Sequence, residues 1–459
     1  MRFGKFGKVF LIGGLSVGVI FGVASCVESN TTGYLYVTGT AASQSSGNGF
    51  IAGYRIDQNT GALTSISGLP AFSGGTNPVR AVLTSGSRFI YVLNRGANAE
   101  GNADCTTDDP CQNANVTEFG VSGNGTVTLQ KAYFSQGTNP FRIIADTTGN
   151  YLLVLDHDAP DNYDITYNPS TNACTLALGS GVQTCGDITV FHIDSTTGNL
   201  SLIANAEVSS GSGGNLNYFP VPANPVDFVL SGGFILTLTG APTPTSFPYT
   251  GGTAVWPYSY APTNGQLTLS QSNAQQLGVH QGNAVVSAGG VVYVLDNEPI
   301  TVTFNGASTT SLSQILPFTV ASGGTLQAEP GGIIPDDPAL SNPVQLMEES
   351  KGKFVYVANQ GEVTGPNAES GIAGYFLTTT PSYQLNFIAG EPFGPLSGPQ
   401  CIVEDPSNHY VYTANSYSSD VTGYEIDQNS GVLRVLQGAG TPNALQGPAT
   451  WCLIDGRTE

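Results

Sequence analysis

Two arginines occupy equivalent positions in a repeated segment, and they are the residues best suited to bind an anion. Arg80 in NPVR (77–80) and Arg142 in NPFR (139–142) each stand two residues after a proline. A guanidinium group can donate paired hydrogen bonds to a carboxylate or a phosphate. The whole chain has only 13 lysines and arginines. We therefore expect this pair either to hold an anionic ligand or to form a salt bridge with a loop carboxylate.

Five apolar segments of the sequence end in an amide or carboxylate residue. These residues are Asn94, Asp156, Asp296, Asn359 and Asn415. Such side chains can contact a ligand at the entrance of a channel, and they can also cap a turn by hydrogen-bonding to nearby backbone. Together with Arg80 and Arg142 they are the predicted ligand-binding residues, and turn capping is the alternative interpretation.

Acidic residues crowd the segment around His157. Asp156, Asp158 and Asp161 offer the oxygen ligands that Ca²⁺ prefers, but their spacing lacks the glycine and the closing glutamate of an EF-hand loop. A solvated acidic loop is the alternative. His157 and Arg142 are the candidates for catalysis, although carboxylates near His157 would favour its protonated form and weaken it as a base. HExxH, Walker and CxxC motifs are missing, and no cofactor is predicted.

The elements that must position these residues come from a unit of about sixty residues that recurs along the chain. The unit contains Asn-Pro, a short apolar run, a turn, a YVxN strand, a GYxID strand, a TG turn and a final short strand. Its starts are NPVRAVLTSGSRFIYVLN (77–94), NPFRIIADTTGNYLLVLD (139–156), NPVDFVLSGGFILTLTG (224–240), GNAVVSAGGVVYVLDN (282–297), NPVQLMEESKGKFVYVAN (342–359) and GPQCIVEDPSNHYVYTAN (398–415).

A seventh unit is divided between the two ends of the chain. GYLYVTGT (33–40) is a second strand without a first, and GPATWCLIDG (447–456) is a first strand without a second. Repeats of this size with four short strands are typical of β-propellers, and joining the two ends closes the ring. The sequence therefore predicts an all-β fold: one seven-bladed β-propeller over residues 33–459, with the C-terminal strand completing the first blade.

The first 26 residues are expected to be a targeting segment. Arg2, Lys5 and Lys8 precede an apolar stretch, and small residues precede Cys26. The run VASC (23–26) resembles a bacterial lipobox, which predicts lipidation of Cys26, with residues 27–32 as a short tether. This places the protein in the bacterial cell envelope, anchored by lipid alone, and Val27 favours the outer membrane. The alternative is an ordinary cleaved signal in which Cys26 is incidental.

The other six cysteines fit an oxidising compartment. Cys105 and Cys111 bracket one insertion, and Cys174 and Cys185 bracket another. Each pair is predicted to form a disulfide. Cys401 and Cys452 lie in the first strands of the last and first blades, one residue out of phase. They either bridge the closure of the ring or remain buried thiols.

Charge and loop length indicate where the protein works. A formal net charge of −20 argues against a nucleic-acid partner. One face of the propeller receives nearly all long connections, where function concentrates on a rigid scaffold. They are 95–114, 157–185, 209–223, 241–252, 328–340 and 360–370. We expect a monomer whose long-loop face binds a glycan, a peptide or an envelope protein.

The strand ends YVLN, YVAN and YTAN, with the GYxID and TGxL continuations, resemble the lactonase-like seven-bladed propellers. This family includes 6-phosphogluconolactonase, and the resemblance implies histidine, arginine and glutamate at the channel mouth. The corresponding starts here read NPFR, NPVD and QGNA, so that only Arg142 is of the expected type. A binding module is therefore the main functional hypothesis, and a lactone hydrolase of the 6-phosphogluconolactonase type is the alternative.

Overall fold

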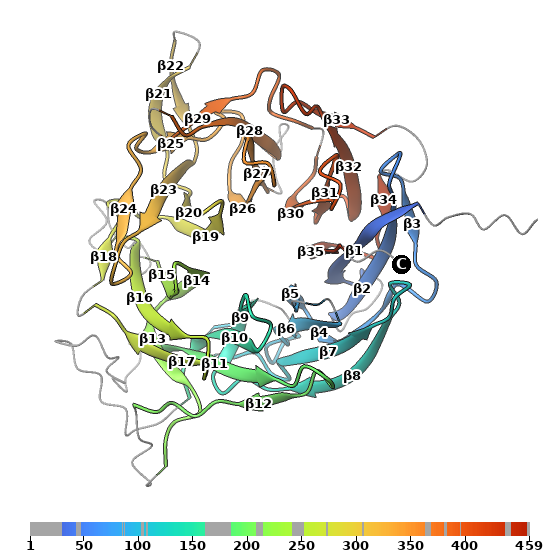
Figure 1. Ribbon diagram of the computed structural model, residues 1–459, viewed down its shortest axis with the longest axis vertical. Helices are drawn as coiled ribbons and strands as arrows, with labels where there is room; N and C mark the ends of the chain where they lie inside the picture. Colours follow the sequence, from blue (N-terminus) through green and yellow to red (C-terminus); the bar gives the residue numbers. More distant parts are fainter. Residues whose placement is uncertain are drawn as a thin grey trace, which may run out of the picture. The chain divides into compact units, whose positions relative to one another are not determined.

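Seven antiparallel β-sheets stand as blades around a central axis (Figure 1). The computed structural model describes residues 30–456, apart from 43–46, 85, 87, 102–104, 107–108, 161–184, 208–213, 241–251, 272–273, 305–306, 363–368, 381–382, 395 and 437–441. Its regular elements are β-strands, and the described part of the chain holds no helix able to cross a membrane. The predicted all-β seven-bladed propeller is confirmed.

The blades are numbered along the chain, and their strands run from the axis outward. Blade 1 contains β35 (Ala449–Asp455), β1 (Thr31–Thr40), β2 (Asn48–Asp57) and β3 (Leu63–Ser65). Blade 2 contains β5 (Pro78–Leu83), β6 (Phe89–Asn94), β7 (Asn115–Val121) and β8 (Val127–Tyr133). Blade 3 contains β9 (Thr138–Ala145), β10 (Tyr151–Asp158), β11 (Cys185–Ile193) and β12 (Leu200–Leu202). Blade 4 contains β14 (Pro225–Ser231), β15 (Phe234–Thr239), β16 (Ala254–Ala261) and β17 (Gln266–Leu269).

The remaining blades follow the same order. Blade 5 contains β19 (Gly282–Ala288), β20 (Val291–Asp296), β23 (Gln314–Val320) and β24 (Leu326–Ala328). Blade 6 contains β26 (Pro343–Glu348), β27 (Phe354–Asn359), β28 (Gly371–Thr378) and β29 (Gln384–Phe387). Blade 7 contains β30 (Pro399–Glu404), β31 (Tyr410–Asn415), β32 (Asp420–Ile426) and β33 (Leu433–Val435).

Five short strands extend the outer edges of the blades, and one hairpin projects from blade 5. The short strands, which pair with third strands, are β4 (Ala71–Thr76), β13 (Phe219–Ala223), β18 (Gln275–Gln276), β25 (Ile334–Pro335) and β34 (Asn443–Ala444). The hairpin consists of β21 (Ile300–Phe304) and β22 (Ala307–Ser311). It belongs to the connection between the second and third strands of blade 5. The repeat pattern did not predict this hairpin.

The second strands show why the sequence repeats apolar runs. FIYVLN, FVYVAN and YVYTAN are buried at every position in β6, β27 and β31. A strand covered on both faces needs a continuous apolar run, whereas a half-covered strand alternates. Each blade therefore depends on both neighbours to cover its faces.

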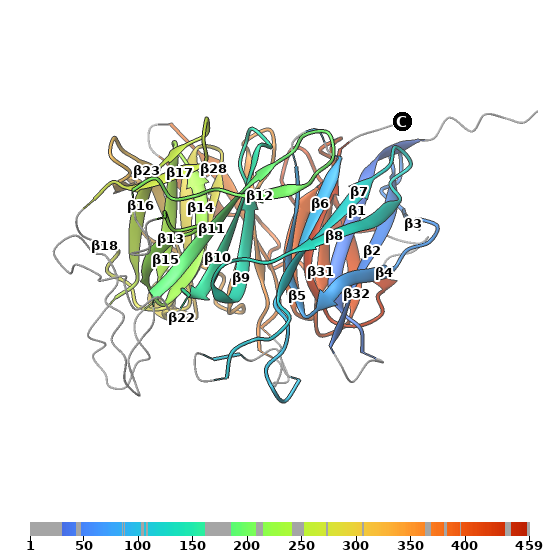
Figure 2. The ribbon, with the colours of Figure 1, turned by 90° about the horizontal axis from the view of Figure 1, so that it is seen from below.

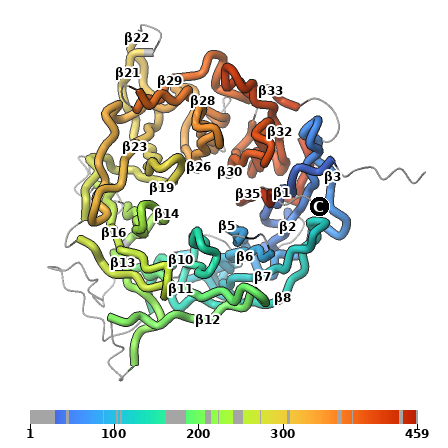
Figure 3. The backbone as a smooth tube through the Cα atoms, in the orientation of Figure 1, coloured from blue at the N-terminus to red at the C-terminus, as the bar shows by residue number. Residues whose placement is uncertain are grey.

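The ring closes between the last and first strands of the chain. β35 pairs with β1 in an antiparallel register from Tyr34 opposite Asp455 to Gly39 opposite Ala449. Figure 3 shows β35 beside β1 where the ring closes. A disulfide between Cys401 and Cys452, with Cα atoms 5.8 Å apart, joins blade 7 to this strand. The closure is as predicted, and of the two alternatives for Cys401 and Cys452 the structure shows the disulfide. β1 begins at Thr31, two residues before the expected start.

Hydrogen bonds between blades explain the recurring tyrosine and glycine. In four blades a second-strand tyrosine hydroxyl donates to the carbonyl of a turn glycine in the next blade, at 2.5 to 2.8 Å. The pairs are Tyr36 with Gly125, Tyr91 with Gly198, Tyr356 with Gly431 and Tyr412 with Gly61. These glycines have φ between 67° and 81°, where a Cβ atom would be strained.

The described ends of the long connections lie on one face of the ring, as the strand order requires. Seen edge-on, the connection between β6 and β7 extends from the same face as β22 (Figure 2). The asparagine of the Asn-Pro motif helps to hold these connections. Asn77, for example, has φ of 49° and donates to the carbonyl of Gly96 at 2.7 Å.

Deleting residues 447–459 should prevent folding, because the loss of β35 leaves the edge of β1 unpaired and removes the disulfide to blade 7. We expect circular dichroism to show no cooperative thermal transition. Deleting only 457–459 keeps β35 complete and should leave the unfolding temperature unchanged. A cooperative transition near the parent temperature after the longer deletion would contradict the closure.

Candidate functional site

Every first strand carries a β-bulge near its start, where the chain enters from the long-loop face. Each bulge leaves one residue without a partner on the second strand. Bulges re-aim side chains next to functional sites. The bulged residues are Val79, Phe141, Val226, Asn283, Val344, Gln400 and Thr450.

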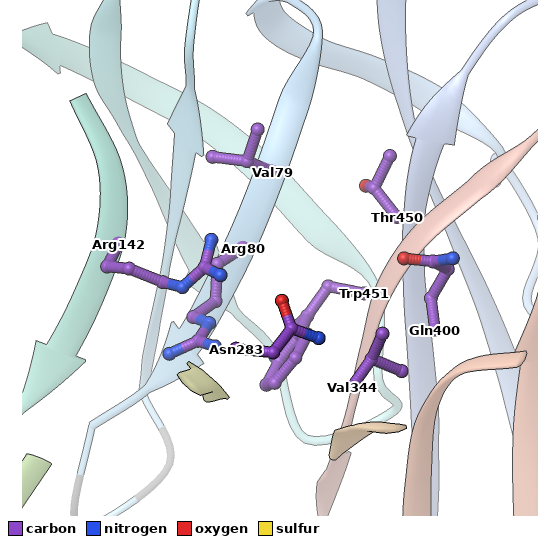
Figure 4. A pocket seen from close by; sticks show the side chains of 8 residues that line it. All are labelled: Val79, Arg80, Arg142, Asn283, Val344, Gln400, Thr450 and Trp451. Atoms are coloured by element: carbon purple, nitrogen blue, oxygen red, sulfur yellow. The ribbon is translucent and has the colours of Figure 1, made fainter. Parts of the chain in front are cut away.

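A cavity lies on the axis among these bulges. Its empty volume is about 410 Å³, part of it open to solvent. Five bulged residues line it together with Arg80, Arg142 and Trp451 (Figure 4). The lining contains two guanidinium groups and no carboxylate.

The two arginines share one buried carboxylate. Arg80 Nη1 lies 3.3 Å and Arg142 Nε 3.1 Å from Asp227 Oδ1. The Asp227 side chain is 1% exposed, whereas Arg80 is 12% and Arg142 26% exposed. The backbone N–H groups of Phe228 and Val285 also donate to Asp227, at 2.9 and 3.1 Å. Asp227 therefore links the first strands of blades 2 to 5.

The salt-bridge partner is thus a strand residue, not the loop carboxylate that we expected. Asp227 is the last residue of NPVD, and it corresponds to Arg80 in NPVR and to Arg142 in NPFR. The three side chains belong to neighbouring blades, so that the ring brings them together. Aligning the repeats would have shown this partner.

Arg80 is the more buried of the two arginines. Its guanidinium carbon lies 4.4 Å from the centre of the Trp451 ring, a cation–π contact. Burial lowers the pKa of Arg80 to about 10, Asp227 opposes this fall, and the charge of Arg142 adds to it. Arg80 remains charged at neutral pH, so the two arginines and Asp227 leave one positive charge in excess.

The five polar residues at the ends of second strands lie inside the blades. Asn94, Asp156, Asp296, Asn359 and Asn415 are all buried. None of them lines the axial cavity. Asp296, for example, accepts hydrogen bonds from the backbone N–H groups of Glu298 and Gln281, at 2.8 and 2.9 Å. At Asp296 this arrangement is turn capping, whereas Asn94 and Asn415 donate to side chains of the third strand. Contact of these five residues with a ligand stays a prediction.

Two histidines on the long-loop side are each paired with a carboxylate. His157 Nδ1 lies 3.1 Å from Asp158 Oδ1, and His280 Nδ1 lies 3.0 Å from Glu298 Oε2. The His157 side chain is 37% exposed. Such a partner can orient a histidine as a base, but neither histidine lines the axial cavity.

The calcium prediction rests partly on residues that the structure does not describe. Asp156 and Asp158 are buried, and Asp161 lies outside the described residues. Among the residues described, no group of three or more His, Cys, Asp or Glu side chains could hold a metal ion. The solvated acidic loop is not what the structure shows at Asp156 and Asp158.

A disulfide fixes the insertion of blade 2 against blade 3. Cys105 and Cys111 are bridged as predicted. The side chain of Asn139 accepts from the Cys111 N–H at 2.7 Å and donates to Asp158 Oδ2 at 2.6 Å. Cys185 is also disulfide-bonded, and its predicted partner Cys174 lies outside the described residues.

Comparison with known proteins gives a consistent result for the fold. A family model of seven-bladed β-propeller lactonases matches residues 287–446. A search of the curated proteins finds no match. A candidate 6-phosphogluconolactonase from Bacteroides uniformis is 14% identical with a TM-score of 0.61, covering 92% of this chain and 100% of that one. The periplasmic gluconolactonase PpgL from Pseudomonas aeruginosa is 17% identical with a TM-score of 0.58, covering 92% and 98%.

At these identities the solved structures show a shared fold, while the family model adds a sequence match over most of blades 5 to 7. The resemblance to the lactonase-like seven-bladed β-propeller family is therefore confirmed.

Proposed function

We propose that this propeller is a binding module that holds an anionic group of its ligand in the axial cavity of the long-loop face. The observation that carries the proposal is the excess positive charge of Arg80 and Arg142 over Asp227, inside a chain with a formal net charge of −20. A buried positive charge is costly without a counter-ion. A carboxylate or phosphate of the ligand would supply one.

The rest of the cavity favours a polar ligand. Asn283, Gln400 and Thr450 provide amide and hydroxyl groups around the arginines, and such groups hydrogen-bond to hydroxyl or peptide groups. Arg142 is the more exposed arginine and would make the first contact. We infer that the ligand is an acidic sugar of a glycan, or an acidic end or side chain of a peptide or envelope protein.

The proposed setting is the bacterial envelope, with the protein tethered to the outer membrane as a monomer. It rests on the lipobox-like sequence before Cys26 and on an even set of cysteines. The two bridges seen among the described residues are compatible with an oxidising compartment.

A lactone hydrolase is the second candidate. It is favoured by the family-model match over residues 287–446 and by the histidine–carboxylate pairs at His157 and His280. Ester hydrolysis needs a base and a donor to the developing oxyanion at one place. The cavity lining supplies donors but no histidine or carboxylate, and for this reason we rank binding first.

Replacing Arg142 with Ala should weaken the binding of glucuronate or glucose 6-phosphate by about tenfold to a hundredfold, the range expected for losing a hydrogen bond to a charged group. Isothermal titration calorimetry would measure this, with uncharged glucose as the comparison ligand. Arg434 pairs with Asp427 on a blade edge and is 63% exposed, so Arg434→Ala is the matched control and should leave affinity unchanged. Equal affinity of wild type and Arg142→Ala for both anions would overturn the proposed site.

Replacing Cys26 with Ala should release the protein from membranes, because a lipidated cysteine is the anchor that we propose. Fractionation of cells producing each form would show wild type in the membrane pellet and the variant in the soluble envelope fraction. A variant that still pellets under high salt would show that Cys26 is not the anchor.

We expect no hydrolysis of 6-phosphogluconolactone or glucono-δ-lactone above the spontaneous rate. The physical reason is that the described lining of the cavity holds no base beside its arginines. A pH-stat assay of the purified domain would measure the rate. Turnover that disappears in His157→Ala or Arg142→Ala would instead establish the hydrolase.

A further inference from the structure

Polar side chains face each other across the second and third strands where these strands reach the long-loop face. In three blades an amide N–H donates to the facing oxygen across this pair. The pairs are Asn94 with Asn115 at 2.9 Å, Gln314 with Asp296 at 3.2 Å and Asn415 with Asp420 at 2.6 Å. An amide can serve here because it carries both donor and acceptor groups.

Blade 3 places two carboxyl groups at this position. Asp156 on β10 stands directly opposite Asp187 on β11, and both residues are 0% exposed. Asp156 Oδ1 accepts from Ser135 at 2.7 Å, and Asp187 Oδ2 accepts from Thr189 at 3.3 Å. The other oxygen of each carboxyl group is buried and has no hydrogen-bond partner within the described part of the chain.

We propose that Asp156 and Asp187 share one proton, so that a carboxylic acid donates to the facing carboxylate where blades 2, 5 and 7 use an amide. Two unpaired buried anions at neighbouring positions would be strongly unfavourable. One proton removes a charge and also supplies the missing donor. The pair then titrates as a unit at a pH far above that of a free aspartate.

The surroundings of the pair support this assignment. Burial raises the pKa of both carboxyl groups, and the nearby carboxylate of Asp158 raises it further. The groups that favour ionisation are neutral: Ser135, the backbone N–H of Gly137, and Thr189. His157, which follows Asp156 in the chain, is bonded to Asp158. No described cation therefore offsets the two carboxyl groups.

The position of the pair gives the proton a structural role. Asp156 and Asp187 are the last paired residues of β10 and β11 before the insertion of blade 3. Loss of the proton would place two negative charges in register in a buried site and would push these strand ends apart. The base of this insertion is thus a pH-sensitive element, independent of whether the axial cavity binds a ligand.

The test compares the pH dependence of unfolding in wild type and Asp187→Asn. The pKa of the Asp156–Asp187 pair is raised in the folded state. At a pH above the ordinary pKa of aspartate, the folded state therefore still holds a proton that the unfolded state has lost. Wild-type stability should therefore fall as pH rises above the ordinary aspartate range, by up to about tenfold in the unfolding equilibrium constant per pH unit, until the folded pair loses its proton. Asp187→Asn would create the kind of amide–carboxylate pair that blades 5 and 7 contain. This variant should therefore lack the loss of stability that the shared proton causes as pH rises.

Two further variants serve as controls. Asp420→Asn in blade 7 removes one carboxylate from an amide–carboxylate pair, and should leave the wild-type pH dependence in place. Gln314→Glu in blade 5 would place a second carboxyl group opposite Asp296. The stability of this variant should fall more steeply with rising pH than that of wild type. Parallel curves for wild type and Asp187→Asn would overturn the proposal.

Two additional measurements cover the other outcomes. If Asp187→Asn fails to fold, infrared spectra of wild type still test the proposal, because a shared proton predicts a carboxylic acid carbonyl band that persists at neutral pH, and its absence would refute it. A chelator that changes wild-type stability but not that of Asp187→Asn would show a bound cation in place of the proton.

Discussion

The requirement that both faces of every blade be covered is the constraint on which the rest of this structure depends. The second strands β6, β27 and β31 are buried along their whole length, and they are mostly apolar up to their final asparagine because neighbouring blades cover them from both sides. Tyrosine hydroxyls tie these strands to the turns of the next blade. A ring of this kind has no stable end, which is why β35 and the Cys401–Cys452 bridge join the last blade to the first.

The same ring determines the chemistry of the axis. Asp227, Arg80 and Arg142 are far apart in sequence, yet they occupy one position in three successive blades and so meet beside the cavity. Two cations around one anion leave the axis positive within an acidic protein. This contrast supports the proposed binding of an anionic group at the axis.

The sequence predicted those features that depend on pattern and order. The repeat gave the number of blades, the divided unit gave the closure, and the phase of Cys401 and Cys452 allowed their bridge. The bulges that turn Asn283 and Gln400 toward the axis leave no signature in a repeat of apolar residues. Asp227 was missed because we looked for a partner in loops, and the buried positions of Asn94 and Asp156 depend on packing that the linear pattern does not contain.

The bulge in each first strand separates the residues that face the axis from those that hold the scaffold. A bulged residue has no partner on the second strand, although Asn283 also donates to the Pro343 carbonyl of the next blade at 2.7 Å. Changes at Val79 or Val344 can therefore alter what the cavity accepts while the strand pairing stays intact. Such a scaffold can acquire new ligands by substitution at a few interior positions, which is one physical route by which relatives of the same architecture can diverge in specificity.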